Sequence, residues 1–128
     1  MGYCMNMRST NFEISNENKD RALELLKSLA GKRLNLSWID NTAVLCSNTL
    51  NEALDECRYD VEEDEFGNVT GIDFTGEKLG DDEQIFNAIA PAVKNGSYLE
   101  MVGEDGLIWR WVIENGKCKE MTAKIEWD

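Results

Sequence analysis

Two Xaa-Gly turns in the last third of the chain constrain the fold more than any other feature. Asp105-Gly106 and Asn115-Gly116 are each flanked by segments in which apolar and polar residues alternate. Such dipeptides favour the tight turns that join neighbouring antiparallel strands, because their residues accept the positive φ that these turns need. We therefore expect strands over residues 98–102, 107–113 and 118–127, joined as an antiparallel meander.

Helical spacing of apolar residues predicts three helices. The first follows Asn16, a good N-cap, and stops at Gly31. The second opens with the capping box Thr49-x-x-Glu52. The third begins at Asp81 or Asp82, and Pro91 should kink or end it. The first helix carries the clearest apolar stripe: Ala22, Leu23, Leu26, Leu29 and Ala30.

Period-two alternation indicates further strands earlier in the chain. Residues 3–14 form either one long strand with a bulge near Ser9-Thr10, which we favour, or a short hairpin. A short strand covers residues 34–38, and a β-hairpin covers residues 59–74. With 128 residues and 42% hydrophobic content, the chain fits a single domain over residues 1–128. The element order predicts an α+β fold in which two to three helices pack on one face of a single antiparallel sheet that ends in the meander.

The net charge of −12 is concentrated in one quarter of the chain. Residues 52–83 contain thirteen acidic residues against two basic ones, Arg58 and Lys78. If Tyr59 and Val61 face the core, the pleat sends Asp60, Glu62 and Asp64 to the opposite side, about 6.6 Å apart. We expect an acidic face that meets a partner, made by Asp60, Glu62, Glu63, Asp64, Glu65, Asp73, Asp81 and Asp82.

The residue types argue against catalysis and against a metal site. The chain has no histidine, which removes the usual general base and the commonest metal ligand. Asp60-x-Glu62-x-Asp64 starts like a calcium-binding EF-hand loop, but Glu65 stands where that loop needs glycine, and Gly71 where it needs glutamate. The four cysteines are widely spread and are expected to be reduced. We predict a non-enzymatic protein with no cofactor and no metal.

Trp109-Arg110-Trp111 has two interpretations. In a strand the two indoles share one face and Arg110 takes the other. Together with Trp38 they would form a pocket for a nucleotide, which makes a small-molecule binding protein or sponge the alternative function. Otherwise they are core tryptophans, and Arg110 pairs with an acid such as Glu100. The area that a tryptophan buries favours the second interpretation.

Three segments carry a resemblance to small acidic proteins of Gram-positive bacteria and their phages: Ile72-Asp73-Phe74-Thr75-Gly76, Phe86-Asn87-Ala88-Ile89-Ala90-Pro91, and the run from Gly103 to Trp111. In element order the chain is also similar to ferredoxin-like α+β domains. Small acidic phage proteins include inhibitors of host defence, among them anti-CRISPR proteins that imitate DNA. The resemblance therefore implies an inhibitor of a host nuclease, but no motif identifies the target.

Charge sets the expected partners and location. A field of this sign repels nucleic acid and anionic membranes and attracts basic surfaces, such as those of nucleic-acid-binding proteins. An acidic surface also serves solubility alone, and that explanation stays open. The N-terminus lacks the features of a signal peptide, so we expect a cytoplasmic protein. Edge strands of the meander offer a dimer contact, but no residue selects that state.

Overall fold

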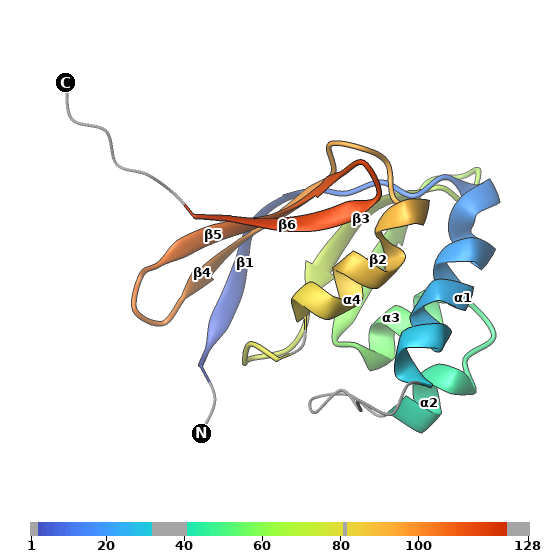
Figure 1. Cartoon of the computed structure of the whole chain (residues 1–128), viewed down its shortest axis with the longest axis horizontal. Coiled ribbons are helices and arrows are strands. Elements are labelled where there is room, and N and C mark those ends of the chain that lie inside the picture. Colours follow the sequence, from blue (N-terminus) through green and yellow to red (C-terminus); the bar gives the residue numbers. More distant parts are fainter. Residues whose placement is uncertain (1–2, 32–40, 81, 123–128) are drawn as a thin grey trace.

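The computed structural model describes residues 3–31, 41–80 and 82–122 and has the expected α+β class. In Figure 1 the helices lie on the right, and the strands extend from the left of the molecule to behind the helices. The strands are β1 (Met5–Asn11), β2 (Tyr59–Glu63), β3 (Val69–Phe74), β4 (Tyr98–Gly103), β5 (Ile108–Glu114) and β6 (Lys117–Thr122). The helices are α1 (Lys19–Ala30), α2 (Asn41–Leu45), α3 (Leu50–Glu56) and α4 (Asp82–Ile89), with 3-10 turns at Asn16–Asn18 and Ala90–Ala92.

The strands form two sheets instead of the single sheet that we predicted. β1, β4, β5 and β6 form a four-stranded antiparallel sheet in the order β1-β4-β5-β6, whereas β2 and β3 pair only with each other. Two isolated antiparallel bridges, Cys4 with Lys78 and Ile14 with Val69, connect residues that flank β1 to the chain at either end of β3. A register shift between Met7 and Ser9 interrupts the β1–β4 ladder close to the predicted bulge.

The turn chemistry confirms the meander. Gly106 has a φ of +85°, and Asn115 and Gly116 have φ values of +51° and +75°. These are the left-handed conformations that glycine and asparagine tolerate best. The expected end of the last strand, residues 123–127, lies outside the described residues, as does the predicted strand over residues 34–38.

The three predicted helices are present, and α2 was not predicted. α1 follows Asn18 instead of the predicted N-cap Asn16, which lies in the 3-10 turn, and it ends at Ala30 with Gly31 as its C-cap. At the start of α3 the side chain of Thr49 accepts a hydrogen bond from the Glu52 amide, as in a capping box, whereas the Glu52 side chain accepts one from the Asn48 amide. α4 ends before Pro91, where the chain continues as a 3-10 turn. None of the helices within the described residues is long and apolar enough to cross a membrane.

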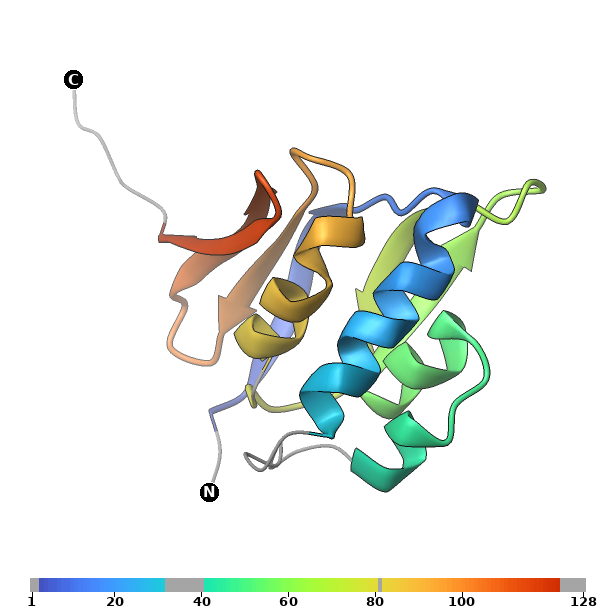
Figure 2. The ribbon, with the colours of Figure 1, turned by 45° about the vertical axis from the view of Figure 1, so that its right-hand side comes forward.

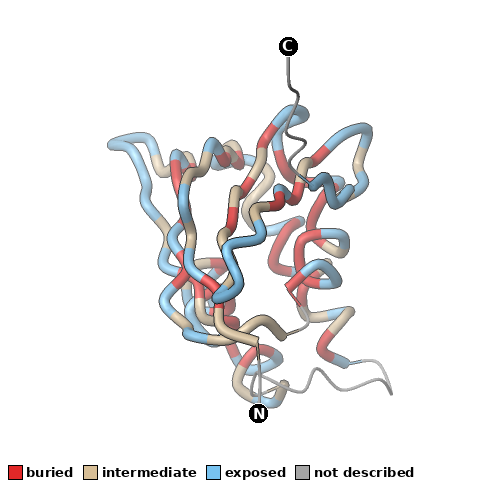
Figure 3. The backbone as a smooth tube through the Cα atoms, turned by 90° about the vertical axis from the view of Figure 1, so that its left-hand side faces the viewer, coloured by how far each residue is buried: buried red, intermediate tan, exposed pale blue. Residues whose placement is uncertain are grey.

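One aromatic ring connects the two sheets through the core. α1 and α4 lie side by side over the strands (Figure 2). From α4, Phe86 packs against Trp111 of β5 with ring centroids 6.0 Å apart, against Tyr59 of β2 at 5.0 Å, and against Phe12 at 5.8 Å. Buried positions alternate with more exposed ones along the central strands β4 and β5 (Figure 3). The buried side chains of both sheets therefore belong to one core.

Candidate functional site

The outward side of the β2–β3 hairpin is acidic. In the register of the two strands, Tyr59 lies opposite Phe74 and Val61 opposite Ile72, and these side chains face the core. The alternate positions point outward, and there Asp60 lies directly opposite Asp73. We call Asp60, Glu62 and Asp73 the acidic hairpin face; all three residues are exposed.

The carboxylates of the acidic hairpin face are not neutralised. None of the three forms an ion pair within the described parts of the chain, where five salt bridges occur at other positions. Like charges directly opposite each other on two strands are destabilising. The Asp60–Asp73 pair therefore costs stability that no ion pair with a cation of the described residues recovers.

Gly71 accommodates the side chain of Glu62. It lies opposite Glu62 in the register, and a Cβ atom at this position would lie 2.9 Å from Glu62 Oε2. Any larger residue would push this carboxylate aside. Glycine at position 71 thus allows the Glu62 side chain to lie across the partner strand.

Two further predicted acids are engaged elsewhere. Glu63 accepts hydrogen bonds from Lys19, at 2.6 Å, and from Asn51, and these bonds lower the pKa of Glu63. Asp64 accepts hydrogen bonds from Asn68 and from the Phe66 amide, which close the hairpin turn and lower the pKa of Asp64. The predicted row Asp60, Glu62 and Asp64 is thus shortened at Asp64, and Asp73 of β3 extends the acidic surface sideways.

Asp82 belongs to the interior, so its predicted place on the acidic face is wrong. Its side chain is fully buried at the start of α4. It accepts hydrogen bonds from the Tyr59 hydroxyl at 2.7 Å, from the Gly80 amide at 2.8 Å and from the Arg58 guanidinium at 3.2 Å. We call Arg58, Tyr59 and Asp82 the buried anchor. Asp81 lies outside the described residues, and Glu65 is exposed at the hairpin turn.

Arg58 joins this anchor to the chain on either side of it. Its φ of +74° is unusual for a residue that is not glycine. Besides Asp82, the guanidinium donates a 2.6 Å hydrogen bond to the Lys78 carbonyl and lies over the Phe74 ring, 5.2 Å from its centroid. Burial and the Asp82 carboxylate raise the pKa of Tyr59 well above its ordinary value, so the hydroxyl stays a donor. The base of the hairpin is therefore fixed to the N-terminal end of α4.

The Trp109-Arg110-Trp111 motif follows the core interpretation. The side chains of Trp109 and Trp111 are buried, 4% and 1% exposed. Arg110 is exposed, donates a 2.8 Å hydrogen bond to Glu100 and lies over the Tyr98 ring. The indoles and the guanidinium therefore take opposite sides of the sheet and do not form the nucleotide pocket that we considered. Trp38, its fourth predicted member, lies outside the described residues.

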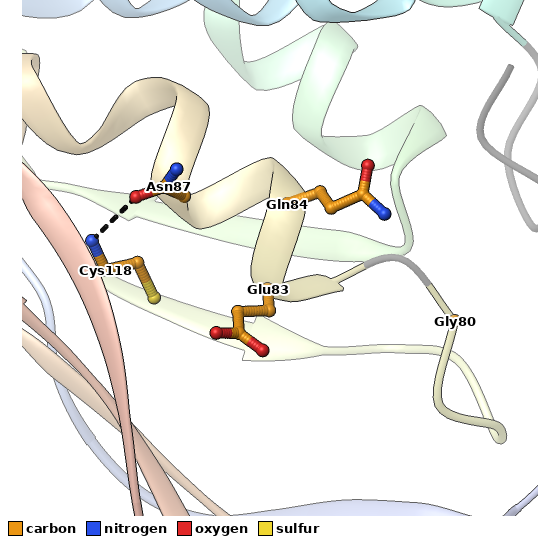
Figure 4. A pocket seen from close by; sticks show the side chains of 5 residues that line it. All are labelled: Gly80, Glu83, Gln84, Asn87 and Cys118. Carbon is orange, nitrogen blue, oxygen red and sulfur yellow. Dashed lines mark hydrogen bonds between the residues drawn. The ribbon is translucent and has the colours of Figure 1, made fainter. Parts of the chain in front are cut away.

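A pocket beside α4 has a polar lining, but the thiol that lines it, that of Cys118, is a weak nucleophile. It encloses about 350 Å³ and is lined by Gly80, Glu83, Gln84, Asn87 and Cys118 (Figure 4). Burial and Glu83 raise the pKa of Cys118 to about 12, which leaves the thiol protonated and weakly nucleophilic. Asn87 accepts a 3.1 Å hydrogen bond from the Cys118 amide. In the described residues no three His, Cys, Asp or Glu side chains form a group that could hold a metal ion.

Comparisons of the chain with models of protein families, with curated proteins and with solved structures found no match.

Proposed function

We propose that this protein acts by binding, and that the acidic hairpin face is the surface it offers to a basic, nucleic-acid-binding partner. The observation that carries the proposal is the Asp60–Asp73 pair. Two carboxylates face each other on neighbouring strands, beside Glu62, with no cation from the described chain between them. A fold under selection for stability alone gains by replacing either aspartate. Attraction to a basic partner would offset the repulsion between these carboxylates.

The spacing of these charges supports mimicry of nucleic acid. Asp60 and Glu62 are two residues apart on one strand, which places them about 6.6 Å apart, and the neighbouring strand lies about 4.8 Å away. Phosphates of duplex DNA follow one another every 3.4 Å of rise along each strand. The carboxylates therefore offer negative charge on a scale that a Lys/Arg-rich nucleic-acid channel accepts. Combined with the resemblance to phage proteins, this favours an inhibitor of a host defence nuclease, similar to anti-CRISPR proteins.

The test is capture of partners by two variants of equal charge. Asp60→Asn, Glu62→Gln and Asp73→Asn together remove the acidic hairpin face. The matched control Glu17→Gln, Asp20→Asn and Glu24→Gln removes the same charge from exposed positions at the start of the α1 region. Each protein is immobilised and exposed to a bacterial lysate at low and at high salt, and duplex DNA is added as competitor.

We expect the wild type and the control to capture the same basic protein. The hairpin variant should capture at least tenfold less of that protein. Added salt and duplex DNA should both release the captured protein, because both compete for its Lys/Arg side chains. Equal loss in the two variants would show that only net charge matters. If duplex DNA does not release the captured protein, the surface does not mimic nucleic acid and the partner is of a different kind.

A further inference from the structure

The side of the four-stranded sheet that faces away from the helices is unusually apolar. Because Phe86 of α4 packs on Trp111, the helices cover the side to which the tryptophans point. The opposite positions of the central strands β4 and β5 are Tyr98, Glu100, Val102, Ile108, Arg110 and Val112. An antiparallel sheet with one open side normally places polar residues there. Here four of these six residues are apolar, so the central strands have the composition of strands covered on both sides.

These apolar side chains form one surface in register. Tyr98 lies opposite Val112, Val102 lies opposite Ile108, and Met121 of the edge strand β6 lies opposite Arg110. All of these apolar residues except Val102 line a hollow of about 540 Å³, together with neighbours that include Glu100 and Arg110. Met121 is 49% exposed, and the others are half-buried. We call Tyr98, Val102, Ile108, Val112 and Met121 the outer sheet face.

The rim of the outer sheet face is basic, although the whole chain has a net charge of −12. Arg8 and Arg110 share a single acid, Glu100, at 3.6 Å and 2.8 Å. Lys117 and Lys119 of β6 lie opposite Glu114 and Val112, and neither forms an ion pair with any residue that the structure describes. In the register the Glu100–Arg110 ion pair lies between the two apolar pairs, and Glu114 lies opposite Lys117. The four cations therefore outnumber these two acids, and an apolar surface with such an excess is complementary to apolar side chains flanked by carboxylates.

We propose that the outer sheet face binds an amphipathic helix of a partner protein, whose apolar stripe is flanked by acidic residues. Helices pack on sheet faces through such stripes, as α4 does on the other side. Nucleic acid fits less well, because Arg110 already lies over the Tyr98 ring, 4.3 Å from its centroid, where a base would stack. A second copy of this chain would bring two basic rims together. The proposal does not depend on the acidic hairpin face.

The probe is a labelled amphipathic helical peptide of leucine and glutamate, titrated into the full chain. Binding is followed by fluorescence anisotropy, and backbone amide shifts in NMR spectra locate the contact. The main variant is Ile108→Thr with Val112→Thr, which removes apolar contact but keeps two β-branched residues that favour a strand. Phe66→Thr is the matched control, because it removes an apolar side chain that is 71% exposed at the hairpin turn. Circular dichroism checks that each variant is folded.

We expect the peptide to shift amides of β4, β5 and β6, and the double variant to weaken binding about tenfold or more, as the loss of buried methyl groups predicts. Lys119→Glu should weaken binding several-fold, whereas Lys27→Glu on α1 and Phe66→Thr should leave it unchanged. Absence of binding, shifts confined to the hairpin, or equal affinity in the double variant would overturn the proposal.

Three other occupants are distinguished by the same reagents. If a single-stranded oligonucleotide shifts the same amides and displaces the peptide, the surface binds nucleic acid instead. If sedimentation shows a wild-type dimer that the double variant abolishes, the occupant is a second copy. If a chain that stops at Thr122 binds the peptide far more tightly than the full chain, the final residues of this protein compete for the surface. Each of these results replaces the proposed partner.

Discussion

The outer side of the β2–β3 hairpin and the base of the same hairpin treat carboxylates in opposite ways. On the outside, Asp60 and Asp73 face each other with no cation between them in the described chain. At the base, Asp82 is fully buried and accepts hydrogen bonds from Arg58, Tyr59 and Gly80. A paired charge in the interior is costly to disturb, whereas two like charges that lie opposite each other at the surface weaken the fold. Acids from one stretch of sequence thus divide into a group that holds the hairpin and a group that is free to bind.

Replacing Asp82 with asparagine should have the largest effect on the free energy of unfolding. The change leaves the Arg58 guanidinium, whose side chain is only 18% exposed, without its counter-charge. Loss of one member of a buried ion pair typically costs about 3–5 kcal/mol of unfolding free energy. Urea unfolding measures the loss, with Asp60→Asn as the surface counterpart that should cost nothing. Similar values for the two variants would show that the buried anchor does not stabilise the protein.

Replacing Tyr59 with phenylalanine should have the next largest effect. The variant keeps the ring that packs against Phe86 and removes only the hydroxyl that donates to Asp82 at 2.7 Å. Hydrogen bonds to charged groups contribute about 1.5–3 kcal/mol, so the free energy of unfolding should fall by that amount. If Tyr59→Phe is as stable as the wild type, the carboxylate is satisfied by Arg58 and Gly80 alone.

Alkaline pH should weaken the fold through its buried thiols, among them Cys57 beside the buried anchor. Burial raises the pKa of Cys57, next to Arg58, from 9.0 to about 12. In the unfolded chain the thiol releases its proton near pH 9, whereas in the folded protein it keeps it, so stability falls as the pH rises from 9 towards 12. Cys57 should contribute about 1.4 kcal/mol of this loss by pH 10, and Cys118, whose pKa is also raised to about 12, adds to it. Urea unfolding at pH 8 and pH 10 measures it, and Cys57→Ala should lose less between the two pH values. An equal loss in that variant would assign the effect to other groups.

Replacing Asp73 with asparagine should have the smallest effect on stability, and of the opposite sign. Relief of the like-charge pair with Asp60 should stabilise the fold by about 0.2–1 kcal/mol. Added salt should stabilise the wild type more than the variant, because salt screens the repulsion that the variant lacks. Thermal unfolding at low and high salt measures both. A destabilised variant would mean that Asp73 has a favourable contact, and the charge argument for the acidic hairpin face would fail.

Local patterns predicted most of the elements and little of their assembly. Xaa-Gly turns, helical spacing and the capping box at Thr49 depend on residues close together in the chain, and the structure confirms them. The division into two sheets depends on contacts between β1 and β3, which are more than 50 residues apart. Alternation shows which side of a strand is polar, but not what lies across from it.

The candidate site shows the same limit. Alternation placed Asp60 and Glu62 outward, which the structure confirms, and it gave no sign that Asp64 closes its own turn. Asp82 was expected to be a surface cap because it precedes an apolar helix. Its partner Arg58 lies 24 residues earlier, beyond the reach of any local pattern. One signal was present: Arg58 is a lone cation between the apolar positions of Cys57 and Tyr59, where an acidic partner was to be expected.

Two isolated bridges, Cys4 with Lys78 and Ile14 with Val69, mark the two ends of the junction between the sheets. Backbone hydrogen bonds cross it near Met5 and Glu77 and again at Ile14 and Val69, while each sheet keeps its own ladder. The rings of Phe86 and Tyr59 pack against each other in the core between the two sheets. We therefore expect a smaller residue at position 86 to change the angle between the two sheets before the strands of either sheet separate. The relative orientation of the acidic and basic surfaces is then set by the size of a single side chain that neither surface contains.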